Sequence, residues 1–138
     1  MKKTEHMSPV VVVTGGARGI GLEICNTFLK RGYRVAALDI DKATLEKTEA
    51  SFNNPSFLAI ACDVSKPALV SRAMERVEKK FGRIDALVNN AGVVDVKARV
   101  DEMSVARWKR MFDINVIGSL ICAREAVRRM STLHGGEG

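Results

Sequence analysis

A glycine-rich turn between a strand-like run and a helix-like run constrains the fold of this chain more than any other feature. Residues 10–13 are four consecutive valines, a pattern typical of a strand buried on both faces. Residues 14–21 then read TGGARGIG. Apolar residues recur four apart over residues 19–31, which predicts a helix that stops at Gly32. A buried strand that leads through glycines into a helix predicts the first unit of an α/β fold.

The same alternation continues along the chain. We expect further strands over residues 33–38, 57–62 and 84–88, and further helices over residues 41–52, 65–81 and 104–130. Asp41 and Ser65 are the predicted N-caps of two of these helices. Short buried strands that alternate with helices imply right-handed crossovers and a parallel sheet. The predicted fold class is α/β, a Rossmann-type doubly wound parallel sheet that stops after its fourth strand and the following helix.

Three of the predicted helices carry apolar rows with a spacing close to one helical turn. Residues at this spacing lie on one side of a helix, so each row predicts an apolar side. The rows are Ile20, Ile24 and Phe28; Leu69, Ala73, Val77 and Phe81; and Trp108, Phe112, Val116, Leu120, Ala123 and Val127.

Composition excludes several classes of function. The net charge is +6, but the basic residues are scattered, and five Phe, one Tyr and one Trp are not interleaved with them, so we expect no nucleic-acid partner. The longest aliphatic run, residues 10–13, is far shorter than a membrane span of ~20 residues. Cys25, Cys62 and Cys122 lie far apart in apolar stretches, which is typical of reduced core thiols rather than of a metal site or disulfides. We expect a cytoplasmic protein without a bound metal.

The glycine turn has the pattern of a phosphate-binding site. Gly15 and Gly19 permit a tight turn, and Gly21 permits close packing of the helix on the sheet. Backbone N–H groups at the start of the helix, with Arg18 and Ile20 beside them, would face a pyrophosphate. The spacing is T-G-x-x-x-G-x-G, which differs from both G-x-G-x-x-G and a Walker loop. A glycine turn without a ligand is the alternative.

Asp39 and Arg18 favour different dinucleotides. Asp39 ends the second predicted strand, 18 residues after Gly21, where a carboxylate accepts hydrogen bonds from ribose hydroxyls. The guanidinium of Arg18 could pair with the 2′-phosphate of NADP. We give Asp39 more weight because its charge would repel a 2′-phosphate, whereas Arg18 could pair with Asp39 or with the pyrophosphate. The predicted cofactor is NAD, with NADP as the alternative.

The length of 138 residues suits one domain. The chain contains neither an internal repeat nor a linker. We predict a flexible N-terminal tail over residues 1–8 and the N-terminal portion of a dinucleotide-binding Rossmann domain over residues 9–138.

From about residue 10 to residue 130, the chain resembles the short-chain dehydrogenase/reductase family. Four signatures match in order: the TGGARGIG turn, the sequence CDV at 62–64, the sequence NNAG at 89–92, and Asn115. The resemblance implies that Asp63 contacts the adenine amino group and that Val64 backs the ring. It also implies that Asn90, Ala91 and Gly92 border the nicotinamide-side ribose. Plain turn chemistry at residues 89–92 is the alternative.

Asn115 resembles a member of the family's catalytic tetrad. In the family, this asparagine helps to hold a water linked to the catalytic lysine. Because Asn115 lies in an apolar segment, we expect a buried amide that needs hydrogen-bond partners. The alternative is an amide at a helix kink, satisfied by backbone groups, and the nearby Gly118 fits such a kink.

Other tetrad members of the family have no match here. The family's serine and its Tyr-x-x-x-Lys pair lie on a later strand and helix. Tyr33 is the single tyrosine of the chain, and Ala37 stands where the lysine would be required. The family's strand order, 3-2-1-4-5-6-7, also implies that strand 84–88 is left as an open edge. We therefore expect a homo-oligomer, a dimer or tetramer, or additional chain beside that edge.

The resemblance implies an NAD-dependent oxidoreductase. Its reaction would be hydride transfer between nicotinamide and a small-molecule carbonyl or alcohol substrate, and this chain would supply the cofactor-binding half. The alternative is a non-catalytic NAD-binding module or an inactive homologue.

Overall fold

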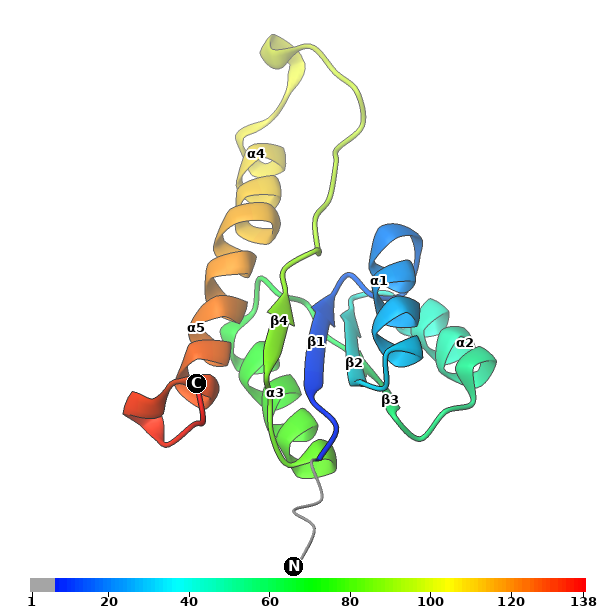
Figure 1. Ribbon diagram of the computed structural model, residues 1–138. Coiled ribbons are helices and arrows are strands. Elements are labelled where there is room, and N and C mark those ends of the chain that lie inside the picture. The colour runs from blue at the N-terminus through cyan, green and yellow to red at the C-terminus, as the bar shows by residue number, and fades with distance from the viewer. Residues whose placement is uncertain (1–6) are drawn as a thin grey trace, which may run out of the picture.

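The computed structural model describes residues 7–138 (Figure 1). The expected tail over residues 1–8 therefore falls almost entirely outside the described residues. The strands are parallel and lie in the order β3-β2-β1-β4, which is the Rossmann-type α/β arrangement expected from the sequence. The elements are β1 (Val10–Thr14), α1 (Gly19–Lys30), β2 (Arg34–Asp39), α2 (Lys42–Phe52), β3 (Phe57–Ala61), α3 (Pro67–Phe81), β4 (Ala86–Val88), α4 (Val105–Phe112), a π-helical segment (Asp113–Gly118) and α5 (Ser119–Met130).

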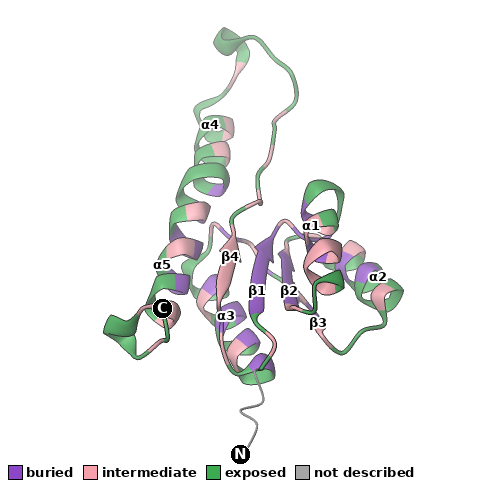
Figure 2. Ribbon diagram, viewed as in Figure 1, coloured by how far each residue is buried: buried purple, intermediate pink, exposed green. Residues whose placement is uncertain are grey.

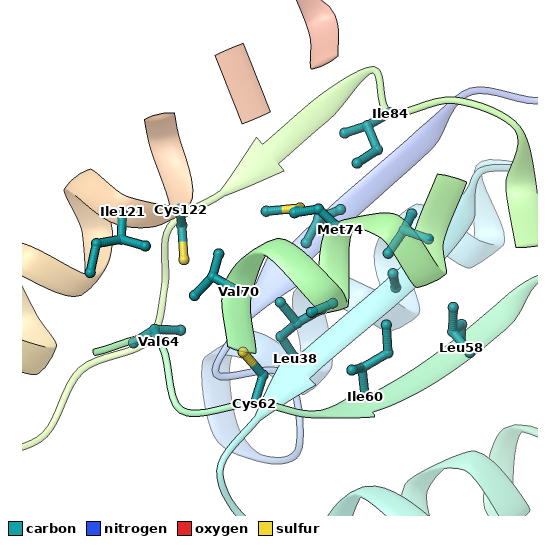
Figure 3. Close-up of a cluster of buried hydrophobic side chains, with 14 of the residues drawn as sticks. Leu38, Leu58, Ile60, Cys62, Val64, Val70, Met74, Ile84, Ile121 and Cys122 are labelled. Carbon is teal, nitrogen blue, oxygen red and sulfur yellow. The ribbon is translucent and has the colours of Figure 1, made fainter. Parts of the chain in front are cut away.

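Two apolar layers cover the two faces of the sheet. Val10 and Val12 of β1 face one layer, which includes side chains of α3 and α5. Val11 and Val13 face the other layer, which includes Cys25 of α1 and residues of α2 and β3. The strand is buried on both faces, as its run of valines predicts (Figure 2). Figure 3 shows the first layer, in which Val70 and Met74 of α3 and Cys122 of α5 belong to one cluster and Val70 lies beside Cys122.

The predicted N-cap residue is correct for α2 and wrong for α3. Asp41 caps α2 as predicted, because its carboxylate accepts from the Thr44 N–H at 3.0 Å. Ser65 does not cap α3. Its N–H and hydroxyl instead donate to Asp63, and the helix begins at Pro67, which has no N–H to satisfy.

The fourth strand is shorter than predicted because Asp85 interrupts the regular ladder. The Asp85 carboxylate accepts from the Val10 N–H at 2.7 Å, so a side chain replaces the backbone acceptor there. Regular pairing with β1 begins at Ala86. Among the described residues, β4 pairs with β1 alone, so its other edge is open.

The predicted helix 104–130 exists, but a π-helical segment divides it into α4 and α5. The apolar row that starts at Trp108 forms an apolar side that residues 7–138 leave largely uncovered: Phe112, Val116, Leu120 and Val127 are each about half exposed or more. The extra residue in a π turn rotates the following residues around the axis, so a row spaced by four leaves the core. In addition, α4 extends beyond the sheet (Figure 1). The residues that pack are Ile114, Ile121, Cys122 and Ala126.

The other two predicted rows are partly correct. Ala73, Val77 and Phe81 are buried, but Leu69 is exposed, and α3 also packs through Val70 and Met74. On α1, Ile20 is 76% exposed at the helix N-terminus.

Candidate functional site

The glycine turn between β1 and α1 has the backbone shape that its sequence predicts. Gly15 and Gly19 have positive φ angles of 67° and 56°, which a side chain would disfavour. The N–H groups of Gly15 and Gly16 donate to the Leu38 carbonyl oxygen at 2.7 and 3.2 Å. A Cβ on Gly21 would lie 2.0 Å from the Gly15 carbonyl oxygen, so α1 approaches the turn as closely as only glycine allows.

The start of α1 fits an anion. The side chain of its N-cap, Arg18, forms no capping hydrogen bond, and the first turn carries no acidic residue. Within residues 7–138, the N–H groups of Gly19 and Ile20 have no acceptor in a turn or cap. Free N–H groups at the positive end of a helix dipole bind phosphate well. The cradle therefore fits the pyrophosphate of a dinucleotide.

Asp39 lies at the end of β2, beside this turn, and both of its carboxylate oxygens are engaged. One oxygen accepts from the Ala17 N–H at 3.1 Å, and the other accepts from the Asp41 N–H at 3.0 Å. On its other side, the Ala17 carbonyl accepts from the buried Thr48 hydroxyl at 3.1 Å. These bonds hold the carboxylate in place, and each oxygen retains acceptor capacity for a ribose hydroxyl.

Arg18 lies beside Asp41 rather than beside Asp39, which was one of the partners that we considered. The Arg18 Nη1 atom lies 3.9 Å from an Asp41 carboxylate oxygen, and the Arg18 side chain is 75% exposed. The bonds from Thr44 hold the pKa of Asp41 below its usual range, and the charge of Arg18 adds to this effect. The Arg18 guanidinium thus lies near the N-terminus of α2, in a solvent-exposed ion pair that constrains it weakly.

Thr14, at the end of β1, connects this strand to the turn that follows β4. Its hydroxyl accepts from the N–H groups of Asn90 and Ala91, each at 3.0 Å, and the Asn90 amide donates to the carbonyls of Thr14 and Gly15 at 3.0 and 3.2 Å. Asn90 therefore supports the glycine turn. Thr14 was absent from our sequence-based list, although a threonine that ends a run of buried valines must find such partners.

The carboxyl ends of the strands surround an open cavity of ≈ 270 Å³. It lies where the strand order reverses between β1 and β4, the usual ligand position in an open α/β sheet. Every predicted cofactor-binding residue except Gly19 lines this cavity. The sequence analysis missed the remaining lining residues, Leu38, Ile40, Cys62, Val93, Arg110 and Ile114. Four of these flank predicted residues, but Arg110 and Ile114 come from the distant long helix, where no local signal marks them.

Asp63 and Val64 form the wall of the cavity after β3. One Asp63 oxygen accepts from the N–H and the hydroxyl of Ser65, at 3.0 and 2.7 Å. Val64 is buried against Gly118, where a Cβ would come within 2.8 Å of a Val64 methyl carbon. Glycine at 118 thus allows the π-helical segment to pack on Val64.

Asn115 is exposed, which corrects the expectation of a buried amide. Its carbonyl oxygen accepts from the Val93 N–H at 2.7 Å, and its NH₂ group donates to the Val93 carbonyl at 2.8 Å. The side chain, which belongs to the π-helical segment, is therefore satisfied by the backbone of Val93 in the segment after β4; the alternative that we considered also had backbone partners for this amide. The backbone carbonyl of Asn115 accepts from the Ser119 hydroxyl at 3.2 Å.

The three cysteines are buried thiols. Burial raises the pKa of Cys25 and of Cys62 to about 12 and that of Cys122 to about 11. Cys62 lines the cavity and lies in the same apolar layer as Cys122 (Figure 3). Tyr33 lies before the amino end of β2, opposite to Asp39, with its ring centroid 4.9 Å from that of Phe28.

The described residues lack two further features. Residues 7–138 bring together no group of three or more His, Cys, Asp or Glu side chains that could hold a metal ion. The same part of the chain contains no helix with the length and hydropathy of a membrane span.

Comparison with known proteins places this geometry in a family. The chain is 36% identical to D-threitol dehydrogenase of Mycolicibacterium smegmatis over 129 residues, which cover 92% of this chain and 49% of that protein. It is 33% identical to 2-(S)-hydroxypropyl-CoM dehydrogenase 3 of Xanthobacter autotrophicus over 129 residues, which cover 92% of this chain and 50% of that protein. The chain thus spans about half the length of these relatives.

A solved structure agrees with the sequence comparisons. The 3-ketoacyl-(acyl-carrier-protein) reductase from Brucella melitensis, complexed with NADH, matches with a TM-score of 0.85 and 32% identity, over 88% of this chain and 50% of that one. The family model for short chain dehydrogenases matches residues 9–138. This chain therefore belongs to the short-chain dehydrogenase family.

Proposed function

We propose that this chain is the cofactor-binding part of an NAD-dependent oxidoreductase that interconverts a small-molecule alcohol and its carbonyl compound. The observation that carries the proposal is the crevice in which an anion-binding glycine turn and the Asp39 carboxylate meet the β4 side of the sheet. The family membership and the relative solved with NADH support the same reading. When bound, the nicotinamide ring supplies the hydride acceptor or donor.

Each set of residues has a proposed role toward the dinucleotide. The N–H groups of Gly19 and Ile20 bind the pyrophosphate, and Asp39 accepts from the adenosine ribose. Asp63 and Val64 border the adenine, and Ala91 and Gly92 border the second ribose. Asn115 holds the wall that follows Gly92 through its paired bonds to Val93.

NAD is the proposed cofactor rather than NADP. A 2′-phosphate on the adenosine ribose would approach the Asp39 carboxylate, which two backbone N–H groups hold in position. Arg18, one of the two arginines that line the cavity, lies with its guanidinium 3.9 Å from an Asp41 carboxylate oxygen. Repulsion at contact distance therefore outweighs the attraction of an exposed guanidinium.

The complete protein is proposed to act as a cytoplasmic homo-oligomer. The reduced, buried state of all three thiols supports a cytoplasmic location. The open edge of β4 and the exposed apolar side of α4 and α5 support association with further copies of the protein. The acid–base pair of the reaction would come from sequence not contained in these 138 residues.

Calorimetric titration of the full-length protein with NADH and NADPH tests the cofactor. We expect NADH to bind more tightly, and Asp39→Asn to narrow or invert the preference because the repulsive charge is removed. Glu46→Gln, on the exposed side of α2, is the matched control and should leave both affinities unchanged. Tighter binding of NADPH by the unmutated protein would refute the cofactor choice. Turnover of NADH with ketones distinguishes an enzyme from an NAD-binding module that does no chemistry.

A further inference from the structure

The segment between β4 and α4, residues 89–104, depends on polar contacts for its position. It extends past the carboxyl end of β4, alongside the long helix (Figure 1). Val93 packs against the first apolar layer, but Val94 is 98% exposed and Val96 is 78% exposed, so beyond Val93 these apolar side chains contribute little burial that could hold the segment. Beyond Val93, its position therefore depends on hydrogen bonds and ion pairs, such as those to Arg107.

Two such anchors exist. The first is the pair of hydrogen bonds between Asn115 and the backbone of Val93. The second joins Asp95 to Arg107 of α4: the Arg107 Nε atom lies 2.5 Å from an Asp95 carboxylate oxygen, and an Arg107 Nη2 hydrogen donates to the Val96 carbonyl at 2.8 Å. The Arg107 guanidinium therefore donates hydrogen bonds both to a side chain and to the backbone of the segment.

The Asp95–Arg107 pair is better placed than an ordinary surface ion pair. Its side chains are 25% and 32% exposed, and it links two elements of the fold. Arg99 and Asp101 of the same segment also form an ion pair, but that pair is 76% and 62% exposed and spans two residues. The hydrogen bond from Arg107 holds the pKa of Asp95 below its usual range, so the pair stays charged at neutral pH.

The anchored segment borders the part of the crevice that lies farthest from Asp39. With the pyrophosphate at the glycine turn and one ribose at Asp39, the second nucleoside must extend toward β4. Gly92 and Val93 line the cavity on that side. A shift of Val93 would therefore change the second half of a dinucleotide site while leaving the first half intact.

We propose that Asp95 and Arg107 are positioning residues that set the wall for the nicotinamide half of the cofactor by fixing the segment that carries Val93. This inference rests on the proposed function. The segment has two anchors with different points of attachment. Asn115 binds Val93 directly, whereas Arg107 binds Asp95 and Val96, which lie two and three residues after Val93.

Binding of NADH and of ADP to the full-length protein tests the proposal, because ADP occupies the glycine turn and the Asp39 side without reaching Val93. We expect Asp95→Asn and Arg107→Gln to weaken NADH binding by about three- to fivefold, in the range of a partly exposed ion pair, with ADP binding within twofold of the unmutated protein. Asp101→Asn, which breaks the exposed pair of the same segment, should change neither affinity.

Two results would overturn the proposal: unchanged NADH affinity in both variants, or equal losses of NADH and ADP, which would show a general structural role. Unchanged ADP binding also shows that the variants are folded. If the unmutated protein prefers NADPH, the proposed cofactor fails, but the same comparison with NADPH and 2′,5′-ADP still decides the role of the pair. If it binds no dinucleotide at all, the proposed function and this inference both fail.

Discussion

Replacing Gly21 by alanine gives the most direct test of the crevice geometry. The added Cβ would lie 2.0 Å from the Gly15 carbonyl oxygen and 2.6 Å from the Asn90 amide nitrogen. Ordinary C···O contacts are about 3.3 Å, so the backbone of the turn itself must move. Moving it disturbs the Asn90 bonds to Thr14 and Gly15, which join β1 to the turn after β4.

The expected cost has two parts. Overpacking against a rigid neighbour costs about 2 kcal/mol, and weakening the Asn90 hydrogen bonds adds about 1 kcal/mol. A total loss of about 3 kcal/mol in the free energy of unfolding lowers the thermal midpoint by about 6–12 °C for a protein as long as the relatives. The displaced turn should also lose most of its affinity for NADH, since the N–H groups of Gly19 and Ile20 no longer converge.

Gly19→Ala is the matched control for this substitution. A Cβ on Gly19 would meet no atom within 4 Å, so the only penalty is its φ of 56°. Left-handed backbone costs a residue with a side chain about 1 kcal/mol, which corresponds to a midpoint shift of about 2–4 °C. Thermal unfolding of both variants of the full-length protein gives the comparison. A Gly21→Ala variant as stable as the unmutated protein, or a larger loss at Gly19, would refute the reasoning.

Two further predictions concern buried groups. Burial alone would raise the pKa of Glu125, but its hydrogen bond from Arg129 and the nearby arginine charges lower that pKa below its usual value. The ionised Glu125 side chain therefore contributes its full stabilisation of the folded state above the unfolded pKa of ~4.3, and this stabilisation is lost as the pH falls below that value. Urea unfolding at neutral pH should show a loss of about 3 kcal/mol for Glu125→Ala, and an acid-induced loss that is smaller in Glu125→Gln than in the unmutated protein. Because burial raises the pKa of Cys25 and Cys62 to about 12 and of Cys122 to about 11, the native protein should resist iodoacetamide at pH 8 and take up three adducts once unfolded. Rapid native alkylation, seen by mass spectrometry, would contradict this.

Much of the fold was predictable because its signals are local. The valine run of β1, the positive φ of Gly15 and Gly19, and the Asp41 cap each depend on residues within about one turn of the chain. Errors arose where a side chain competes with regular backbone bonding. Asp85 shortens β4 in this way, and Pro67 delays the start of α3.

The long helix shows what hydrophobic spacing leaves undetermined. Periodicity assumes a constant rotation per residue, and the π-helical segment breaks that assumption. The sequence placed Trp108 and Phe112 on an apolar side, but α4 has no sheet beside it among the described residues (Figure 2). Hydrophobic spacing identifies an apolar side without identifying what covers it.

By itself, the sequence determined the alternation of strands and helices, the glycine turn and the acid at the end of β2, because short-range sterics and spacing dictate these features. Only the tertiary structure decided that Thr14 holds Asn90, that Asn115 holds Val93, and that Arg18 faces Asp41 rather than Asp39. Each of these contacts joins atoms that are separated along the chain and that become neighbours only when the sheet and helices pack. Their energies depend on distance and geometry, which no local pattern of residues contains.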